Sequence, residues 1–332
     1  MTEGKGSTIL SGHDVDLATR AAWMHFAGGM TQSEVADRLG ITRLKAHRLI
    51  ARATQDGVVR VFIDGDIVAC VQLETRLCEI YGLGFCQIVP EVDGDALPLK
   101  ALGMVGARFL QSVLERGEDK LIGVGHGRTL AACVDHLPRM RGGKTRFVSL
   151  LGGLTRKFSA NPHDVIHRLA DRTGAEAYVM PVPFIANTPE DRAVLLAQKG
   201  IGDVFALAKK ASLLVIGVGT VLREASLVAT GMIERSEIDQ VKRAGGCGEI
   251  LGHFFDAKGR MVDTDVSRRT ISLEIDDLRG RNIVAIAGGL TKAEGIGSVL
   301  ASGLIRGLIT DERTAARLVE TQPRPALPTR RR

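Results

Sequence analysis

The sequence lacks the usual markers of export, membrane insertion and disulfide stabilisation. No apolar run approaches the roughly eighteen residues of a membrane span. The first residues, "MTEGKGSTILSGHDVD", do not show the charged and then apolar order of a signal peptide. The five cysteines include no C-x-x-C pair and are odd in number, which favours reduced, mostly buried thiols. These absences predict a soluble, cytoplasmic protein.

Two nucleotide-binding signatures are also missing. The stretch "LIGVGHGRTL" (121–130) offers G-x-G-x-G and not G-x-G-x-x-G, and the next apolar run, "RFVSLL", ends in Gly152 and Gly153 without an acid that would hold a ribose. The phosphate-binding motif G-x-x-x-x-G-K-[ST] does not occur. We therefore expect neither a dinucleotide nor a nucleoside triphosphate, and no cofactor.

Length and charge suggest two domains and a tail. A chain of 332 residues with 45% hydrophobic residues is typical of a folded protein of about two domains. The net charge of +6 is concentrated in "QPRPALPTRRR" (322–332), so residues 1–321 carry only +2. Proline and arginine in this tail predict disorder. The expected domains are 1–63 and 64–320, followed by a disordered tail at 321–332.

The first domain has the pattern of a helix-turn-helix. In "DVDLATRAAWMHFAGGM" (14–30), Leu17, Ala21 and Met24, with Trp23 nearby, predict one side of a helix. "TQSEVADRLGITRLKAHRLIARATQDG" (31–57) begins with a T-x-x-E capping box. Gly40 then permits a sharp helix end, and Thr42 caps a second helix with an apolar side that we expect to consist of Leu44, Ala46, Leu49 and Ile50.

The second of these helices is strongly basic. Between Arg38 and Arg60 there are six lysines and arginines against one acid, Asp56. A basic second helix in a helix-turn-helix is typical of major-groove binding. We expect base contacts mainly from Arg43 and Arg48 and phosphate contacts from Thr42 and Arg52, within a DNA-binding set of Thr42, Arg43, Lys45, His47, Arg48 and Arg52. A short strand or wing is expected in "VVRVFID" (58–64), before a helix that starts near residue 66.

Four apolar runs in the second domain each end in glycines and pass into a helical pattern. They lie at 121–137, 146–170, 213–227 and 283–304. Strands that alternate with helices predict a parallel, doubly wound α/β sheet with its ligand at the carboxyl ends of the strands. Backbone N–H groups at the first of these loops, with Arg128 and Thr129, suit a small anion. Lys292, predicted in the first turn of a helix where a cation is disfavoured, would suit the same anion.

A further glycine-rich stretch, "GGCGEILGHFFDAKGRMVD" (245–263), contributes polar candidates. Glu249 and Asp256 suit hydrogen bonds from sugar hydroxyls. Glu249 and His253 would alternatively serve as an acid and base, or as an i, i+4 metal pair, but no other liganding cluster lies near them in the sequence. No metal site is predicted.

The order of these motifs resembles the SorC family of bacterial transcriptional regulators from about Leu17 to Val319. The matching stretches are "MTQSEVADRLGITRLKAHRLIARATQDGVV", "VGHGRTL", "VSLLGG", "GVG", "GEILGHFFDAKG" and "GGLTKAEGIGSVLASGLIRGLITDERTA". Within the family the chain looks most similar to regulators of polyol use, such as the erythritol regulators. His126 departs from the family, which often has tryptophan or another residue there.

The resemblance implies a transcriptional regulator of a carbohydrate or polyol operon, either a repressor or an activator, that binds operator DNA and a small sugar, polyol or sugar-phosphate effector. It implies an effector domain related to sugar-phosphate isomerases and deaminases that has lost the reaction, so no catalytic residue and no enzyme activity are expected. It also implies a homotetramer built from dimers. The implied effector-binding residues are Gly125, Gly127, Arg128, Thr129 and Lys292 near phosphate and Glu249 and Asp256 near sugar. His126, in the same loop, belongs to this effector-binding set without an assigned side. The alternative is an active isomerase or deaminase with an added DNA-binding domain.

Overall fold

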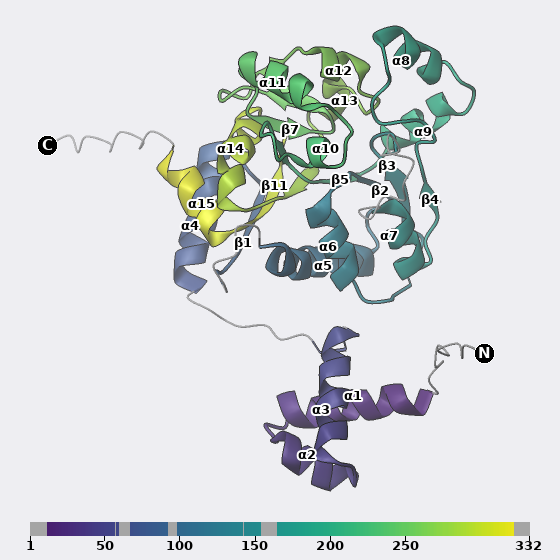
Figure 1. Cartoon of the computed structure of the whole chain (residues 1–332), viewed down its shortest axis with the longest axis vertical. Helices are drawn as coiled ribbons and strands as arrows, with labels where there is room; N and C mark the ends of the chain where they lie inside the picture. Colours follow the sequence, from purple (N-terminus) through teal and green to yellow (C-terminus); the bar gives the residue numbers. More distant parts are fainter. Residues whose placement is uncertain are drawn as a thin grey trace, which may run out of the picture. The chain divides into compact units, whose positions relative to one another are not determined.

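The computed structural model divides the chain into two compact units, Met1–Asp64 and Gly65–Arg332. It describes residues 12–56, 58–59, 67–91, 98–141, 143–153 and 165–321. Most of the predicted wing at 58–64 and the predicted tail from residue 322 onward lie outside the described residues. Figure 1 shows the helices and strands of each unit. Among the described residues, no helix is both long and apolar enough to cross a bilayer.

The described part of the N-terminal unit contains three helices, α1 (Gly12–Phe26), α2 (Gln32–Leu39) and α3 (Arg43–Gln55). The predicted capping box is present, since Thr31 accepts from the Glu34 N–H and the Glu34 carboxylate accepts from the Thr31 N–H. Gly40 ends α2 in the left-handed conformation, with φ 64°. The core is made mainly of small side chains, which let the helices approach closely: Ala18, Ala21, Ala22, Met24, Val35, Ala36, Ala46, Leu49, Ile50 and Ala53.

Two residues expected on the inner sides of these helices lie outside instead. Trp23 is 66% exposed and Leu44 is 59% exposed. The buried residues of α3 are Ala46, Leu49, Ile50 and Ala53, which follow the i, i+3, i+4, i+7 rule without Leu44. The prediction for Leu44 was wrong because it relied on residue type, whereas the helical period places this position opposite the core.

The described residues of the second unit form a parallel sheet of seven strands, in the order β1-β11-β10-β5-β2-β3-β4. These strands are β1 (Phe85–Val89), β2 (Leu121–Val124), β3 (Arg146–Ser149), β4 (Ala177–Tyr178), β5 (Leu213–Ile216), β10 (Ile283–Ile286) and β11 (Gly307–Asp311). The predicted runs supply β2, β3, β5 and β10, the four adjacent central strands. All of their residues except Arg146 are buried, as expected for a sheet covered on both faces.

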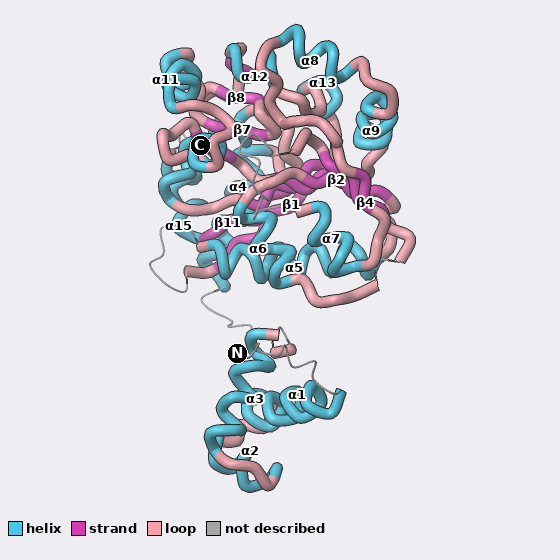
Figure 2. Tube along the Cα trace, turned by 45° about the vertical axis from the view of Figure 1, so that its right-hand side comes forward, coloured by secondary structure: helices cyan, strands magenta, loops and turns pink. Residues whose placement is uncertain are grey.

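Helices cover both faces of this sheet, as a doubly wound fold requires. One face packs against α5 (Leu99–Arg116), α6 (Arg128–His136) and α7 (Ile166–Thr173). The other packs against α4 (Ile67–Tyr81), α9 (Ile201–Ala208), α14 (Ala293–Ala301) and α15 (Glu312–Glu320). Figure 2 shows α5, α6 and α7 together on one side of the strands, with α8 (Pro189–Leu196) and α9 on the other.

A second, antiparallel sheet was not predicted. It pairs β6 (Gly219–Thr220), β7 (Gly248–Ile250), β8 (His253–Phe255) and β9 (Met261–Val262) in sequence order. The sheet lies among four short helices, α10 (Ser226–Ala229), α11 (Arg235–Arg243), α12 (Asp265–Arg269) and α13 (Ile275–Leu278). The stretch 245–263 is therefore largely a pair of hairpins, which decides where its polar side chains point.

The five cysteines are all free thiols. Cys70 and Cys133 are buried, whereas Cys78, Cys86 and Cys247 are only partly buried. The expectation of mostly buried thiols thus holds for two of the five. Burial raises the pKa of the Cys133 thiol to about 12, so this cysteine packs as an apolar side chain.

Candidate functional site

A cavity of about 90 Å³ lies at the carboxyl ends of the central strands. Its wall combines the loop after β2, the turn after β5, the hairpin of β7 and β8, and the 3₁₀ turn Leu290–Lys292 after β10. Seven of the eight predicted effector residues line it: Gly125, His126, Gly127, Arg128, Thr129, Glu249 and Lys292. The segments after β2, β5 and β10 meet here because parallel strands end at one edge of their sheet, and the β7–β8 hairpin of the antiparallel sheet adds the fourth part of the wall.

The loop after β2 presents the start of a helix to the cavity. Gly127 precedes α6 with φ 124°, a conformation that side chains other than glycine rarely adopt. Among the described residues, no side chain caps this helix, and the residues of its first turn line the cavity. Arg128 is exposed and Thr129 is buried at the same turn. This arrangement is suited to an anionic ligand group.

Glu249 is the acid of the cavity and extends from β7. Its Oε1 accepts the Gly252 N–H at 2.5 Å, which fixes the carboxylate against the β7–β8 turn. A Cβ atom at Gly219 would collide with Oε2, so the neighbouring strand β6 leaves just enough room for this side chain. Burial raises the pKa of Glu249 to about 7, while the Gly252 N–H and the charge of Lys292 oppose the rise.

Lys292 faces the same cavity from the end of the 3₁₀ turn, immediately before α14 and not within its first turn. Its Nζ donates to the Val218 carbonyl at 3.3 Å. Burial lowers the pKa of Lys292 to about 8, the nearby Arg128 lowers it further, and Glu249 raises it. An anionic ligand would therefore stabilise the charged form of Lys292, which burial disfavours.

The structure does not bring Asp256 into the cavity. Its Oδ1 accepts the backbone N–H groups of Lys258 and Arg260, and its Oδ2 pairs with the Arg260 guanidinium at 2.8 Å. These contacts hold the pKa of Asp256 below its usual value. The carboxylate stabilises the turn between β8 and β9, so its predicted sugar contact has no geometric support.

His253 and Glu249 do not form an acid and base pair. Glu249 is paired with Phe254 and Ile250 with His253 across the β7–β8 hairpin. Because side chains alternate along a strand, His253 projects to the face opposite Glu249. Its Nε2 contacts the Leu273 carbonyl at 2.8 Å, and burial lowers its pKa. Among the described residues, no group of three or more His, Cys, Asp and Glu is placed to hold a metal ion.

Sequence analysis missed the apolar wall of the cavity. This wall includes Leu151, Phe184, Ala225, Leu227 and Leu251. Leu251 has φ 50° and is the single non-glycine residue with positive φ among the described residues. It precedes Gly252, with φ 81°, so the two form the turn of a two-residue hairpin, where Asn-Gly is the favoured pair. A leucine-glycine turn between short apolar runs was the signal available in the sequence.

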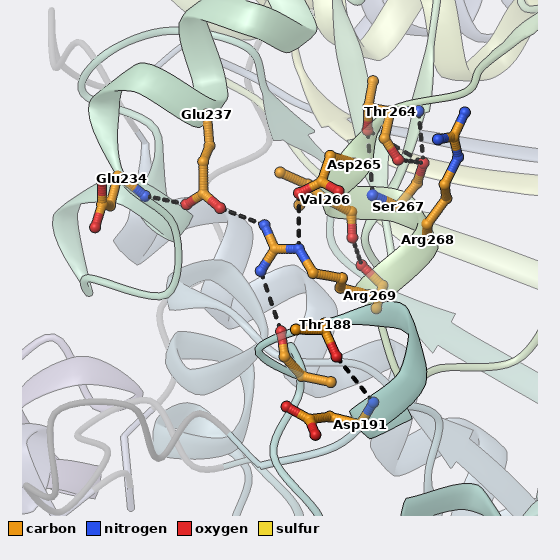
Figure 3. A network of polar contacts seen from close by, with 12 residues as sticks. Thr188, Asp191, Glu234, Glu237, Thr264, Asp265, Val266, Ser267, Arg268 and Arg269 are labelled. Carbon is orange, nitrogen blue, oxygen red and sulfur yellow. Dashed lines mark hydrogen bonds and ion pairs between the residues drawn. The ribbon is translucent and has the colours of Figure 1, made fainter. Parts of the chain in front are cut away.

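A buried arginine connects two segments beside this wall. Arg269, at the end of α12, is 4% exposed. It donates to Asp265 Oδ2 at 2.9 Å and to the Ala186 carbonyl at 3.1 Å, and its third contact is the Glu237 carboxylate of α11. Figure 3 shows the guanidinium between Glu237 and Asp265. Because Ala186 lies two residues after Phe184, Arg269 positions a segment that contributes to the cavity.

The candidate DNA-binding residues occupy the start and the outer side of α3. Thr42 accepts the Lys45 N–H at 3.3 Å as the predicted cap. Arg43, Lys45, His47 and Arg48 are exposed, as a nucleic-acid contact requires. Arg52 differs from them, because its Nε pairs with Asp56 Oδ2 at 3.2 Å. A phosphate contact from Arg52 would have to share the guanidinium with this acid.

Comparison with known proteins shows the family to which the chain belongs. The family model described as "Putative sugar-binding domain" matches residues 65–320. The erythritol catabolism regulatory protein EryD of Brucella abortus (strain 2308) is 54% identical over 306 residues, covering 92% of this chain and 97% of EryD. The full-length sorbitol operon regulator SorC of Klebsiella pneumoniae superposes with a TM-score of 0.67 at 27% identity, over 92% of this chain and 99% of SorC. The chain belongs to the SorC family of sugar-binding transcriptional regulators.

A second relative extends this similarity. The transcriptional regulator LsrR of Enterobacter sp. (strain 638) is 32% identical over 305 residues, covering 90% of this chain and 91% of LsrR. These relatives are regulators and not enzymes. The chain is accordingly a transcriptional regulator with a sugar-binding domain, and the alternative of an isomerase or deaminase is not supported.

Proposed function

We propose that the cavity binds a small polyol or its phosphate ester, and that this binding changes the affinity of α3 for operator DNA. The observation that carries the proposal is the cavity itself. It combines one carboxylate, Glu249, two cations, Arg128 and Lys292, and an uncapped helix start, at the sheet edge where α/β proteins bind ligands. Its volume of about 90 Å³ suits a ligand of a few carbon atoms better than a nucleotide.

The polyol class is supported by EryD, which is 54% identical to this chain and is named as a regulator of erythritol catabolism. Glu249 would accept hydrogen bonds from hydroxyl groups, while the α6 N-terminus, Thr129 and Lys292 would hold a phosphate if the effector carries one. The walls at Phe184 and Leu251 would contact its carbon chain.

On the DNA side, we propose that α3 enters the major groove with Arg48 as its main base-reading cation. Arg48 lies on the outer side of α3, whereas Arg43 lies nearer the core face and is better placed, with Thr42, Lys45, His47 and Arg52, to contact the edges of the groove. One helix-turn-helix per chain requires a dimer or tetramer for specific binding. We further propose that the regulator acts as a repressor released by its effector.

A two-step experiment tests this function. Erythritol, related polyols and their phosphate esters are screened for an increase in melting temperature, because a ligand that binds only the folded state stabilises it. The operator, selected from random DNA, is then titrated with and without the active compound. We expect a roughly 5- to 150-fold change in operator affinity. A compound that stabilises the protein and leaves operator affinity unchanged would contradict the proposed coupling.

Lys292→Ala is expected to weaken the effector response and to leave ligand-free operator binding intact. If the effector is anionic, the loss of a charge-assisted contact worth about 1.5–3 kcal/mol raises the required effector concentration roughly 10- to 150-fold. Operator titrations over a range of effector concentrations measure this shift. The control is Lys258→Ala, an exposed lysine in the β8–β9 turn outside the cavity. An unshifted response in Lys292→Ala would place the anion elsewhere.

Arg48→Ala is expected to reduce sequence preference more than general affinity. A bidentate arginine–guanine contact is worth about 1–3 kcal/mol of discrimination, so operator affinity should fall roughly 5- to 150-fold with little change on random DNA. Fluorescence anisotropy with both duplexes at one salt concentration measures the two losses. Lys45→Ala, at the flank of α3, should weaken both duplexes equally. If Arg48→Ala lost the same affinity for operator and for random DNA, Arg48 would contact phosphate and not a base.

A further inference from the structure

An aliphatic side chain occupies the middle of the exposed side of α3. Leu44 is 59% exposed. The buried face of the helix is formed by Ala46, Leu49, Ile50 and Ala53. At about 100° per residue, Leu44 lies roughly 170° from the centre of that face. It therefore points directly away from the core of the N-terminal unit.

Three exposed residues share this direction. Arg48, Ala51 and Gln55 lie within roughly 40° of Leu44 around the helix axis. By the same construction, Arg43 lies roughly 70° and Lys45 roughly 90° from the centre of the buried face. The outward-facing side of α3 therefore begins with Leu44 and Arg48, and the cations Arg43 and Lys45 lie to either side of it.

These surroundings restrict what can cover Leu44. The same surface of a second copy would bring Arg43, Lys45 and Arg48 against their own equivalents, which like-charge repulsion disfavours. A partner must instead be negatively charged and present an apolar group in a groove wide enough for a helix. The DNA major groove meets all three conditions, since phosphates line its edges and the thymine C5-methyl group lies on its floor.

We infer that Leu44 contacts thymine methyl groups in each operator half-site and sets a thymine preference beside the base pair read by Arg48. This inference rests on the proposed DNA-binding function and adds a specificity-determining residue to it. Leu44 supplies apolar contact and no hydrogen bond, so it distinguishes thymine by its methyl group alone.

Single deoxyuridine substitutions test the inference, because uracil differs from thymine only by lacking that methyl group. Full-length wild-type protein and Leu44→Ala are titrated against the selected operator and against duplexes with one thymine replaced at a time. For wild type we expect about a three- to five-fold loss at one or two thymines per half-site, the value of one buried methyl group. Leu44→Ala should bind the thymine and uracil forms of those positions equally.

Lys45→Ala is the matched control and should keep the wild-type sensitivity to uracil. Because Leu44 is exposed, Leu44→Ala should also keep the wild-type melting temperature, which excludes misfolding as the cause. A Leu44→Ala protein that still distinguishes thymine from uracil would overturn the inference, as would a wild-type protein indifferent to every substitution. Altered sedimentation with unaltered uracil sensitivity would assign Leu44 to a contact between copies. If the wild-type protein selects no operator from random DNA, the proposed DNA-binding function is wrong, and the inference about Leu44 is wrong with it.

Discussion

Glu249→Gln is expected to stabilise the ligand-free protein above pH 7 and to impair its response to effector. The carboxylate is buried at the cavity, which raises its pKa to about 7 from the ordinary 4.5. Keeping it charged in the folded protein above that pH costs up to about 3 kcal/mol. Glutamine keeps the size of the side chain and an oxygen that can accept the Gly252 N–H, but it carries no charge.

The pH dependence has a defined sign. A carboxyl group with a raised folded-state pKa imposes no penalty below its unfolded value of 4.5, and the penalty grows until pH exceeds about 7. Wild type should therefore lose stability relative to Glu249→Gln between pH 5 and pH 7.5. Melting temperatures of the ligand-free proteins across that range measure the divergence. If the melting temperatures of wild type and Glu249→Gln changed in parallel with pH, the Glu249 carboxylate would be adequately solvated in the folded protein.

The effector response should change in the opposite direction. A polyol that donates hydroxyl hydrogen bonds to the Glu249 carboxylate loses a charge-assisted contact in Glu249→Gln, so the effective concentration should rise roughly 10- to 150-fold. Asp256→Asn is the control in the adjacent hairpin. The pKa of the Asp256 carboxyl is lowered and not raised, so the stability that this carboxylate contributes is lost only as pH falls. The effector response of Asp256→Asn should match that of wild type. A Glu249→Gln protein with unchanged response would remove Glu249 from the ligand contacts.

The sequence predicted the parts of the fold that depend on local rules. The capping box at Thr31 and Glu34 and the left-handed Gly40 involve residues close in the chain, so their pattern is legible without tertiary structure. The central strands are apolar on both faces and end in glycines, which predicted β2, β3, β5 and β10. Since parallel strands end at a common edge, the same reasoning brought Gly125, Gly127 and Lys292 together.

The missed features depend on contacts between distant residues or on strands too short to show a period. The strands of the small sheet have two or three residues, so alternation could not reveal that Glu249 and His253 face opposite ways. Asp256 is near Glu249 in the chain, yet the turn after β8 takes up its carboxylate. Arg269 contacts Glu237, 32 residues away, and Ala186, 83 residues away, and no local pattern encodes such a pairing.

Arg269→Met is expected to destabilise the second unit by about 3 kcal/mol. Methionine keeps an apolar stem of similar length but removes the donors that bind Asp265, Glu237 and the Ala186 carbonyl. Removing one partner of a buried ion pair typically costs about 3–5 kcal/mol, because the remaining charge is left uncompensated. Glu237 would lose its cation while only 17% of its side chain is exposed. Urea unfolding followed by circular dichroism measures the change.

The neighbouring residue provides a close control, since Arg268 lies on the same helix and also pairs with an acid. The Arg268–Asp263 pair is at the surface, with 61% and 60% of the side chains exposed, so Arg268→Met should cost less than about 1 kcal/mol.

The chain's single tryptophan, Trp23, lies in the N-terminal unit. Its fluorescence therefore reports on the N-terminal unit, which carries neither change. Because Arg269 holds the segment that carries Phe184, Arg269→Met should also weaken effector binding, measured by calorimetry below the unfolding transition. If Arg269→Met and Arg268→Met were equally stable, the buried contacts of Arg269 would contribute no more to stability than the surface ion pair of Arg268.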